Sequence, residues 1–217
     1  MSILINRKIN ASAVKRFTII SIVLVAGLLS ALFFGFHRSQ PDLPCVVIQT
    51  NQGVITIEVD TVRSVVSGRN FLSLVEHGNY SNSSFYRVVR LDNQFNSKYP
   101  IEVIQGGLFV DSLIDRLGSI RHETTQETGI LHTDGVISMA RSVPGTASSE
   151  FFICIGNQPE LDYGGRRNPD GQGFSAFGHV VAGMDVVQKI QQQADTSQYL
   201  VTPVAIISMQ VRKTASK

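Results

Sequence analysis

Arg87 is the side chain whose surroundings most suggest chemistry, because its charge stands in the otherwise apolar stretch FYRVV. An arginine in such a run can be an ordinary exposed strand residue. It can also be a rigid, planar hydrogen-bond donor directed into a binding site. His122 and His132 fall in a stretch without clear periodicity, and we interpret both as structural rather than catalytic.

The sequence contains no motif with the spacing of a metal site. The pair His122-Glu123 is followed by Gln126, where the HExxH zinc motif requires a histidine. Cys45 and Cys154 are far apart in the chain, and Cys154 lies within an apolar run. We interpret Cys154 as a small buried hydrophobic residue rather than half of a disulfide, and we expect no bound metal.

A second candidate for function is the stretch 136–156, VISMARSVPGTASSEFFICIG. Two runs rich in β-branched and aromatic residues, typical of strands, flank a connection of small and polar residues. A loop with such small side chains can lie close beneath a bound chain, so the stretch could form the rim of a binding site. The simpler interpretation is a β-rich protein with a long connection.

The elements that would position these residues are mostly strands. CVVIQT and VITIEVD predict a hairpin, and SSFYRVV, IEVIQGGLFV, FSAFGHVVAG and VAIISMQVRK predict further strands. Apolar spacing predicts one helix between Ser64 and His77 and another over MDVVQKIQQQA. We expect a surface insertion at 90–100, mainly loop over 111–135, and a turn-dense, solvated loop carrying Arg166 and Arg167. The pattern favours a closed barrel or a sandwich, with helices available to cap a barrel's open ends.

The charge of the chain is unevenly distributed. Four of its 19 basic residues lie in the first 36 positions, and the remaining 15 face 17 acidic residues. Nucleic-acid binding requires a clustered excess of Lys and Arg, so this balance argues against a nucleic-acid partner.

The N-terminal region predicts a membrane anchor. Residues 17–36 carry no charged side chain, and about 20 helical residues span a hydrocarbon core of roughly 30 Å. Basic residues in 1–16 predict a cytoplasmic N-terminus and an exported domain. A cleaved signal peptide is the alternative, although the apolar run is long for one and no clean cleavage site ends it. Residues 37–44 are expected to be a linker, and residues 45–213 the folded domain.

FYRVV, IQGG, ISMA with the small-residue loop, SSEFFI and FSAFGHV occur in an order that resembles the cyclophilin family of peptidyl-prolyl cis-trans isomerases. The resemblance covers about residues 45–213. It implies a mainly β fold, an eight-stranded antiparallel barrel closed on itself and capped by two α-helices, with the active site on the outer face. With the anchor, this fold would follow a single transmembrane helix.

The resemblance also implies site residues. Arg87 resembles the catalytic arginine of the family. Eight further residues are implied to contact the substrate: Gln105, Met139, Ala140, Arg141, Glu150, Phe152, Leu161 and Phe174. Phe152 would form the floor of a proline pocket and Leu161 a side wall, with Met139 meeting Phe152 on the outer face. Phe151 and Ile153 would point into the core.

Several positions depart from the family pattern. Glu102 falls near the place of an aromatic pocket wall, Glu150 replaces a common glutamine, and Glu160 stands where a large aromatic is frequent. Arg141 replaces a common asparagine and Phe174 a frequent histidine. The Glu150 carboxylate could pair with Arg87 and orient it, or could neutralise it.

The implied activity is isomerisation of X–Pro bonds in exported proteins that are folding or unfolded, without metal or cofactor. We expect a monomer anchored in the membrane through 17–36, with its domain on the periplasmic side of a bacterial inner membrane. A binding module or chaperone that retains the groove but catalyses poorly is the main alternative. A structural role with an unused groove is the third.

Overall fold

The computed structural model of the protein describes residues 42–212. The expected cytoplasmic stretch at 1–16, the expected anchor at 17–36 and most of the linker lie outside the described residues. Between residues 42 and 212, no helix has the length and apolar character that crossing a bilayer requires.

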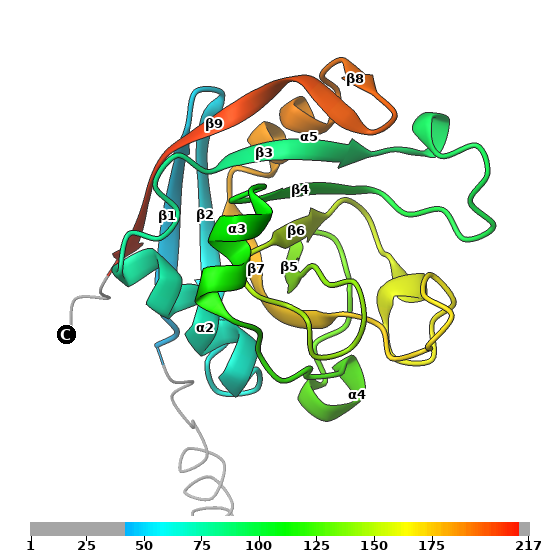
Figure 1. Cartoon of the computed structure of the whole chain (residues 1–217), viewed down its shortest axis with the longest axis horizontal. Coiled ribbons are helices and arrows are strands. Elements are labelled where there is room, and N and C mark those ends of the chain that lie inside the picture. The colour runs from blue at the N-terminus through cyan, green and yellow to red at the C-terminus, as the bar shows by residue number, and fades with distance from the viewer. Residues whose placement is uncertain (1–41, 213–217) are drawn as a thin grey trace, which may run out of the picture. The chain divides into compact units, whose positions relative to one another are not determined.

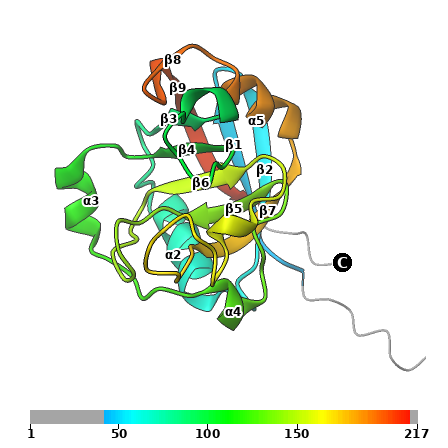
Figure 2. The ribbon, with the colours of Figure 1, turned by 90° about the vertical axis from the view of Figure 1, so that its right-hand side faces the viewer.

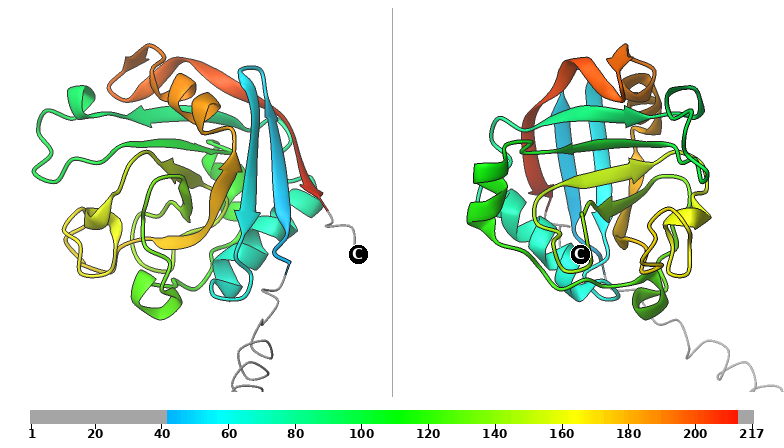
Figure 3. Two further views of the ribbon diagram at one scale, coloured as in Figure 1. Left: turned by 180° about the vertical axis from the view of Figure 1, so that it is seen from behind. Right: turned by 45° about the vertical axis from the view of Figure 1, so that its right-hand side comes forward.

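Eight antiparallel strands form a closed ring, in the order β1-β2-β7-β5-β6-β4-β3-β9, and β1 pairs with β9 to close it (Figure 1). The ring strands are β1 (Cys45–Thr50), β2 (Gly53–Val59), β3 (Ser84–Val89), β4 (Val103–Gly107), β5 (Val136–Met139), β6 (Phe151–Cys154), β7 (Ser175–Ala182) and β9 (Tyr199–Arg212). Figure 3 shows the β1–β2 hairpin beside the C-terminal half of β9. The expected eight-stranded barrel is confirmed.

The predicted β1–β2 hairpin forms with Thr50 opposite Gly53. The Thr50 hydroxyl accepts hydrogen bonds from the backbone N–H groups of Gln52 and Gly53, at 3.0 and 3.1 Å. Gly53 has φ 144°, a backbone conformation that favours glycine, so the Asn-Gln-Gly connection can turn tightly.

Two helices cover opposite ends of the barrel, as Figures 1 and 2 show. α2 (Val65–Glu76) buries Phe71, Leu74 and Val75 against the barrel, and α5 (Met184–Gln191) buries Val186, Val187 and Ile190. Both positions agree with the helical spacing in the sequence, since residues three and four apart share one face.

The stretch 111–135, expected to be mainly loop, contains α3 (Asp111–Leu117) and α4 (Thr125–Thr128) on the outside of the barrel (Figure 2). That expectation was wrong because helices of seven and four residues are too short to show a period. α4 is nevertheless capped, since the Thr124 hydroxyl accepts from the Glu127 N–H at 3.2 Å. Two 3₁₀ turns, η1 (Leu91–Asn93) and η2 (Pro159–Leu161), complete the helical elements of residues 42–212.

The last strand begins earlier than expected. A two-residue strand, β8 (Asp195–Thr196), forms a hairpin with the start of β9 at Tyr199. The sequence hid this hairpin because its turn residues are Ser197 and Gln198, which have φ of 53° and 75°. Two-residue hairpin turns with positive φ usually carry Asn and Gly.

The side chains of strand β6 point alternately to the inner and outer faces of the barrel. Phe151 and Ile153 belong to the inner core, as predicted, and Phe151 packs edge-on against Phe71 with ring centroids 5.5 Å apart. Phe152 and Cys154 belong to a second apolar cluster, which lies on the other face of the same strand. This outer cluster is the base on which the candidate site is built.

Candidate active site

Arg87 lies beside Gln105 on adjacent strands. β3 and β4 pair with these two residues opposite each other, and Arg87 Nη1 donates to Gln105 Oε1 at 2.9 Å. The register of β3 shifts between Phe85 and Arg87 against both neighbouring strands. Such an irregularity re-aims a side chain, and here it accompanies a guanidinium on the outer face of the barrel.

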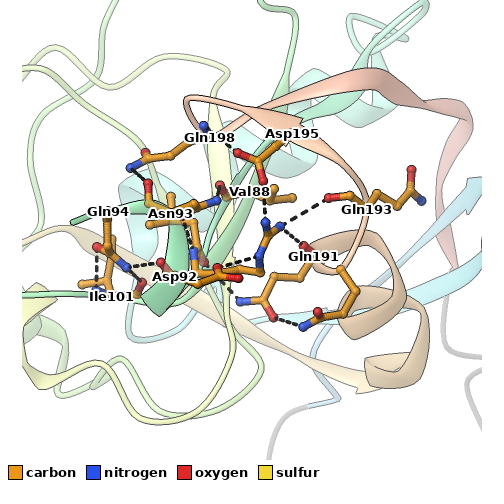
Figure 4. Close-up of polar contacts among 12 residues, drawn as sticks. Val88, Asp92, Asn93, Gln94, Ile101, Gln191, Gln193, Asp195 and Gln198 are labelled. Carbon is orange, nitrogen blue, oxygen red and sulfur yellow. Dashed lines mark hydrogen bonds and ion pairs between the residues drawn. The ribbon is translucent and has the colours of Figure 1, made fainter.

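The turn between β8 and β9 brings Gln198 to the other side of the same guanidinium. Gln198 Oε1 accepts from Arg87 Nε at 3.1 Å and from Arg87 Nη2 at 2.5 Å. Its amide nitrogen in turn donates to the Asn93 carbonyl at 3.3 Å (Figure 4). Arg87 is therefore held between two neutral amide oxygens.

An ion pair fastens this turn to the end of β3. Arg90 Nη2 lies 2.5 Å from Asp195 Oδ2, and Arg90 Nη1 donates to the Gln191 carbonyl at 2.7 Å. The other Asp195 oxygen accepts from the Gln198 backbone N–H at 2.8 Å. Figure 4 shows Asp195, Gln191 and Gln198 in this part of the structure. Gln198 is thus held by hydrogen bonds at both its backbone N–H and its side-chain amide.

Arg87 keeps donors to spare. Its three hydrogen bonds use three of the five N–H groups of a guanidinium, and within residues 42–212 the other two have no protein partner. Burial lowers the pKa of Arg87 from its ordinary value, although a guanidinium stays charged at neutral pH. The side chain is a fixed cation with free donors.

A pocket of about 250 Å³, with one apolar wall, opens beside Arg87. Its apolar wall is formed by Ile101, Val103, Ala140, Phe152, Leu161 and Phe174. Phe152 and Phe174 meet edge to face with centroids 5.3 Å apart, and their rings form two adjoining walls of this slot. Polar residues at the rim are Arg87, Gln105, Arg141, Arg167 and Asn168.

Seven of the nine predicted site residues line this pocket: Arg87, Gln105, Ala140, Arg141, Phe152, Leu161 and Phe174. Met139 does not, and its expected place on the outer face was wrong. It is 1% exposed, pairs with Phe151 across β5 and β6, and packs in the inner core. Because side chains alternate along a strand, Met139 and its neighbour Ala140 face opposite ways.

Glu150, the other residue that does not line the pocket, forms no ion pair with Arg87 within the described residues. Its carboxylate accepts a short hydrogen bond from the Tyr86 hydroxyl and another from the Leu108 backbone N–H at 2.7 Å. The Tyr86 oxygen also accepts from Gln105 Nε2 at 2.8 Å. Glu150 therefore neither orients nor neutralises Arg87 directly, but is connected to it through Tyr86 and Gln105. Burial, first, and the Glu150 charge, second, raise the pKa of Tyr86.

Arg141 supports the rim of the pocket. Its guanidinium pairs with Asp170, donates to the Gly173 carbonyl at 2.9 Å and lies 5.1 Å from the centroid of the Phe174 ring. This contact holds Phe174 at the edge of the slot. The side chain is 1% exposed, so the guanidinium acts as a brace and leaves the backbone of 140–141 to face a ligand.

Glu102 and Glu160, the other two acidic residues that differ from the family pattern, do not obstruct the pocket. Glu102 is not among the residues that line it, and the aliphatic wall comes from the flanking Ile101 and Val103. Glu160 forms an ion pair with Arg166, whose guanidinium lies 4.4 Å from the centroid of the Tyr99 ring.

His132 supports the floor of the pocket from behind. Its ring stacks on Phe152 with centroids 5.9 Å apart, and its two nitrogens lie 2.8 Å from Asp162 Oδ1 and 3.0 Å from Ser138 Oγ. His122 bonds to Ser175 and the Gln172 carbonyl. Both histidines thus make contacts that support the structure, and the interpretation that they are structural rather than catalytic stays a prediction.

Four residues that line the pocket were not predicted from the sequence: Ile101, Val103, Arg167 and Asn168. The Gln198 side chain, which accepts hydrogen bonds from Arg87, was not predicted either. Val103 and Ile101 could have been found, because they lie two and four residues before Gln105 and so share its face of the strand. Arg167 was interpreted as part of a solvated loop, and Gln198 carries no signal in the sequence. Both come from connections whose paths depend on tertiary contacts.

The chain matches the family model for the cyclophilin type peptidyl-prolyl cis-trans isomerase/CLD over residues 45–211. It is 31% identical to a peptidyl-prolyl cis-trans isomerase of Acinetobacter baylyi over 195 residues, which cover 87% of this chain and 95% of the relative. It is 32% identical to peptidyl-prolyl cis-trans isomerase B of Escherichia coli, over 67% of this chain and 83% of the relative.

Among solved structures, a cyclophilin type peptidyl-prolyl cis-trans isomerase of Cryptosporidium parvum matches with a TM-score of 0.62 at 21% identity, covering 79% of this chain and 99% of that one. A second crystal structure of that protein, determined in the presence of the dipeptide Ala-Pro, matches with a TM-score of 0.60. These likenesses concern the fold. Together with the family match and the sequence relatives, they show that this chain belongs to the cyclophilin-type peptidyl-prolyl cis-trans isomerases.

Proposed function

We propose that this isomerase acts on X–Pro bonds of exported proteins while they fold, as a monomer held at the membrane through residues 17–36. The observation that carries the catalytic part is the fixed guanidinium of Arg87, which lines a slot together with the apolar side chains of Phe152, Leu161 and Val103. The anchored location rests on the uncharged stretch 17–36 and on the basic residues that precede it.

The reaction requires only that the protein stabilise the twisted peptide bond of the transition state more than the planar bond of the ground state. Partial double-bond character sets a barrier of about 18–20 kcal/mol to rotation. Twisting localises a lone pair on the prolyl nitrogen, and the free N–H groups of Arg87 are available to donate to it. Each 1.4 kcal/mol or so of preference for the twisted state accelerates isomerisation tenfold.

The slot would hold the pyrrolidine ring while the bond turns. Phe152, Leu161 and Val103 are nearly or fully buried side chains that present apolar surface to it. Gln105 and the backbone at 140–141 lie at the rim, where they can bind the peptide that flanks the ring. Neutral oxygens alone hold Arg87 within the described residues, so its charge remains available for the transition state.

Activity is tested with residues 40–217 and a proline-containing peptide, by following cis-trans exchange with NMR line shapes. The proposal predicts acceleration that saturates with peptide. Peptide binding without acceleration would instead select the alternative of a binding module or chaperone.

The location is tested separately, by fusing the full chain to a reporter that is active only outside the cytoplasm and fractionating the cells. An anchored domain predicts reporter activity in the membrane fraction with the N-terminal segment retained. Activity in the soluble exported fraction would select the cleaved signal peptide, and an inactive reporter would contradict export.

A further inference from the structure

Five arginines lie in or near the slot beside Arg87, and they differ in whether a carboxylate balances their charge. Three of them pair with carboxylates: Arg90 with Asp195, Arg141 with Asp170, and Arg166 with Glu160. Arg87 and Arg167, which line the proline slot itself, form no ion pair within residues 42–212. The positive charge left unbalanced is thus concentrated at the slot.

Arg167 is held by neutral oxygens on one corner of its guanidinium. Its Nη1 donates to the Ser97 hydroxyl at 2.5 Å, to the Tyr99 carbonyl at 2.9 Å and to Gln94 Oε1 at 3.3 Å. These partners all belong to the 90–100 arm, which extends from the end of β3 beside the 155–174 loop (Figure 1). The arm therefore has a role that the sequence did not reveal: it orients Arg167.

The opposite edge of the guanidinium is open. Neither Nε nor Nη2 of Arg167 has a hydrogen-bond partner among the described residues. These two nitrogens form an edge of the planar group that matches the two oxygens of a carboxylate, the geometry in which arginine binds carboxylates most strongly. Arg167 is half-buried, so such a contact would be partly shielded from water.

The electrostatic surroundings favour an anion at this edge. Burial lowers the pKa of Arg167, and the like charge of Arg87, which lines the same pocket, lowers it further. A carboxylate placed near them would offset both the repulsion and the desolvation.

Arg167 also borders a second hollow, of about 360 Å³, formed by Gln198 and residues of the 90–100 arm. Arg167 thus lines both the slot and the neighbouring hollow, which leaves space beside it for a side chain next to a proline bound in the slot.

From this arrangement we infer that Arg167 is a specificity-determining residue, which selects substrates carrying an aspartate or glutamate next to, or one residue removed from, the isomerised proline. The inference rests on the proposed function, because it assumes that the peptide's proline occupies this slot. The chemical class of substrate is an acidic proline-containing segment.

The test uses a set of peptides that contain a single proline. At each of four positions, the two before and the two after the proline, one residue is varied between Glu, Gln and Lys. At low salt, wild-type protein should isomerise the Glu peptide about tenfold more efficiently in kcat/KM than the Gln peptide in at least one position, as for a hydrogen-bonded ion pair. The Lys peptide should be worst at that position.

Arg167→Gln should abolish the preference, so that the ratio of kcat/KM for the Glu peptide to kcat/KM for the Gln peptide falls to about one. Arg166→Gln is the matched control: it removes a neighbouring arginine that is already paired with Glu160, so the preference should persist. If Arg167→Gln melts below the assay temperature, Arg167→Lys retains a charge without the two-pronged edge and should reduce the preference several-fold.

Equal kcat/KM for the Glu and Gln peptides in wild type at all four positions would overturn the inference and leave the isomerase function intact. Peptide affinities measured by NMR titration give the same comparison without turnover. A protein that accelerates none of the peptides but binds the Glu peptide more tightly would contradict the proposed function and support the inference.

Discussion

Gln105 accepts a hydrogen bond from Arg87 at 2.9 Å and donates one to the Tyr86 hydroxyl at 2.8 Å. Because its amide has one oxygen and one nitrogen, the Tyr86 contact fixes which of the two faces Arg87. The Tyr86 hydroxyl is itself directed by Glu150. Glu150, which replaces the family's common glutamine, is thereby connected to the Arg87 guanidinium through three successive hydrogen bonds.

Tyr86→Phe tests this relay. Loss of the hydroxyl leaves the Gln105 amide free to turn, and its nitrogen can then face Arg87. We expect kcat/KM to fall about three- to tenfold, with the larger part in kcat, since the loss corresponds to about one ordinary hydrogen bond. The measurement is cis-trans exchange on a single proline peptide. Tyr163→Phe, at an exposed tyrosine, should have no effect, and an equal loss in both variants would contradict the relay.

Gln198→Gly removes the Gln198 side chain while the backbone of the turn can keep its conformation. Gln198 has φ 75°, which glycine adopts without strain, so the fold should keep its stability to within about 1 kcal/mol. Two hydrogen bonds to Arg87 are lost, and kcat should fall about tenfold.

Ser197→Gly is the matched control for that substitution. It makes the same backbone change at φ 53° without removing a contact to Arg87, and it should retain full activity. Thermal melts measure the stability of both variants, and cis-trans exchange rates of a proline peptide measure their activity. Unchanged activity in Gln198→Gly would show that Gln198 does not position Arg87.

Much of the fold followed from local patterns. The β1–β2 hairpin, α2 and α5 were predicted because each has a period or turn signal within its own sequence. The two faces of β6, which is apolar throughout, were expected from the resemblance to the cyclophilin family. α3, α4 and the β8–β9 hairpin were missed because they are short, or because their turn residues are not the usual ones. These elements form through contacts that only the folded chain provides.

The site was predictable where it lies on strands. Gln105 and Phe152 were correctly expected to line a pocket, and Val103 follows from the same alternation. Met139 was misplaced because a strand with both faces buried gives no apolar-polar alternation to show which side chain faces inward. Gln198 and Arg167 lie on connections, and no pattern in the sequence indicates that the two connections meet at Arg87.

Glu123 predicts a pH dependence of stability. Its carboxylate accepts hydrogen bonds from the backbone of Ser67 at 2.8 Å and of Val66 at 3.0 Å, at the N-terminus of α2. Burial raises the pKa of Glu123, but these hydrogen bonds outweigh it and the pKa lies below its ordinary value. A lowered pKa stabilises the fold above the unfolded value of about 4.3, and the stabilisation is lost as pH falls through the folded value.

Glu123→Gln should therefore lower the free energy of unfolding by about 1–2 kcal/mol at pH 7, and the difference from wild type should shrink below about pH 4. Urea titrations at pH 7 and pH 3 measure both. Glu127→Gln, at an exposed residue that pairs with Arg121, is the control and should change stability little. A difference that grows toward acid pH would contradict the assigned role.

Arg87 is central to the proposed mechanism, and its role is tested most directly by the isomerisation rate of one proline peptide with wild type, Arg87→Ala and Arg87→Lys. Arg87→Ala should lose about 10²- to 10³-fold in kcat, the scale for removing one donor to a transition state, while its circular dichroism and peptide affinity stay near those of wild type. Arg87→Lys should recover only part of the rate, because a lysine cannot hold both amide oxygens and still donate in a fixed direction. Full activity in Arg87→Ala, with the fold intact, would contradict the mechanism.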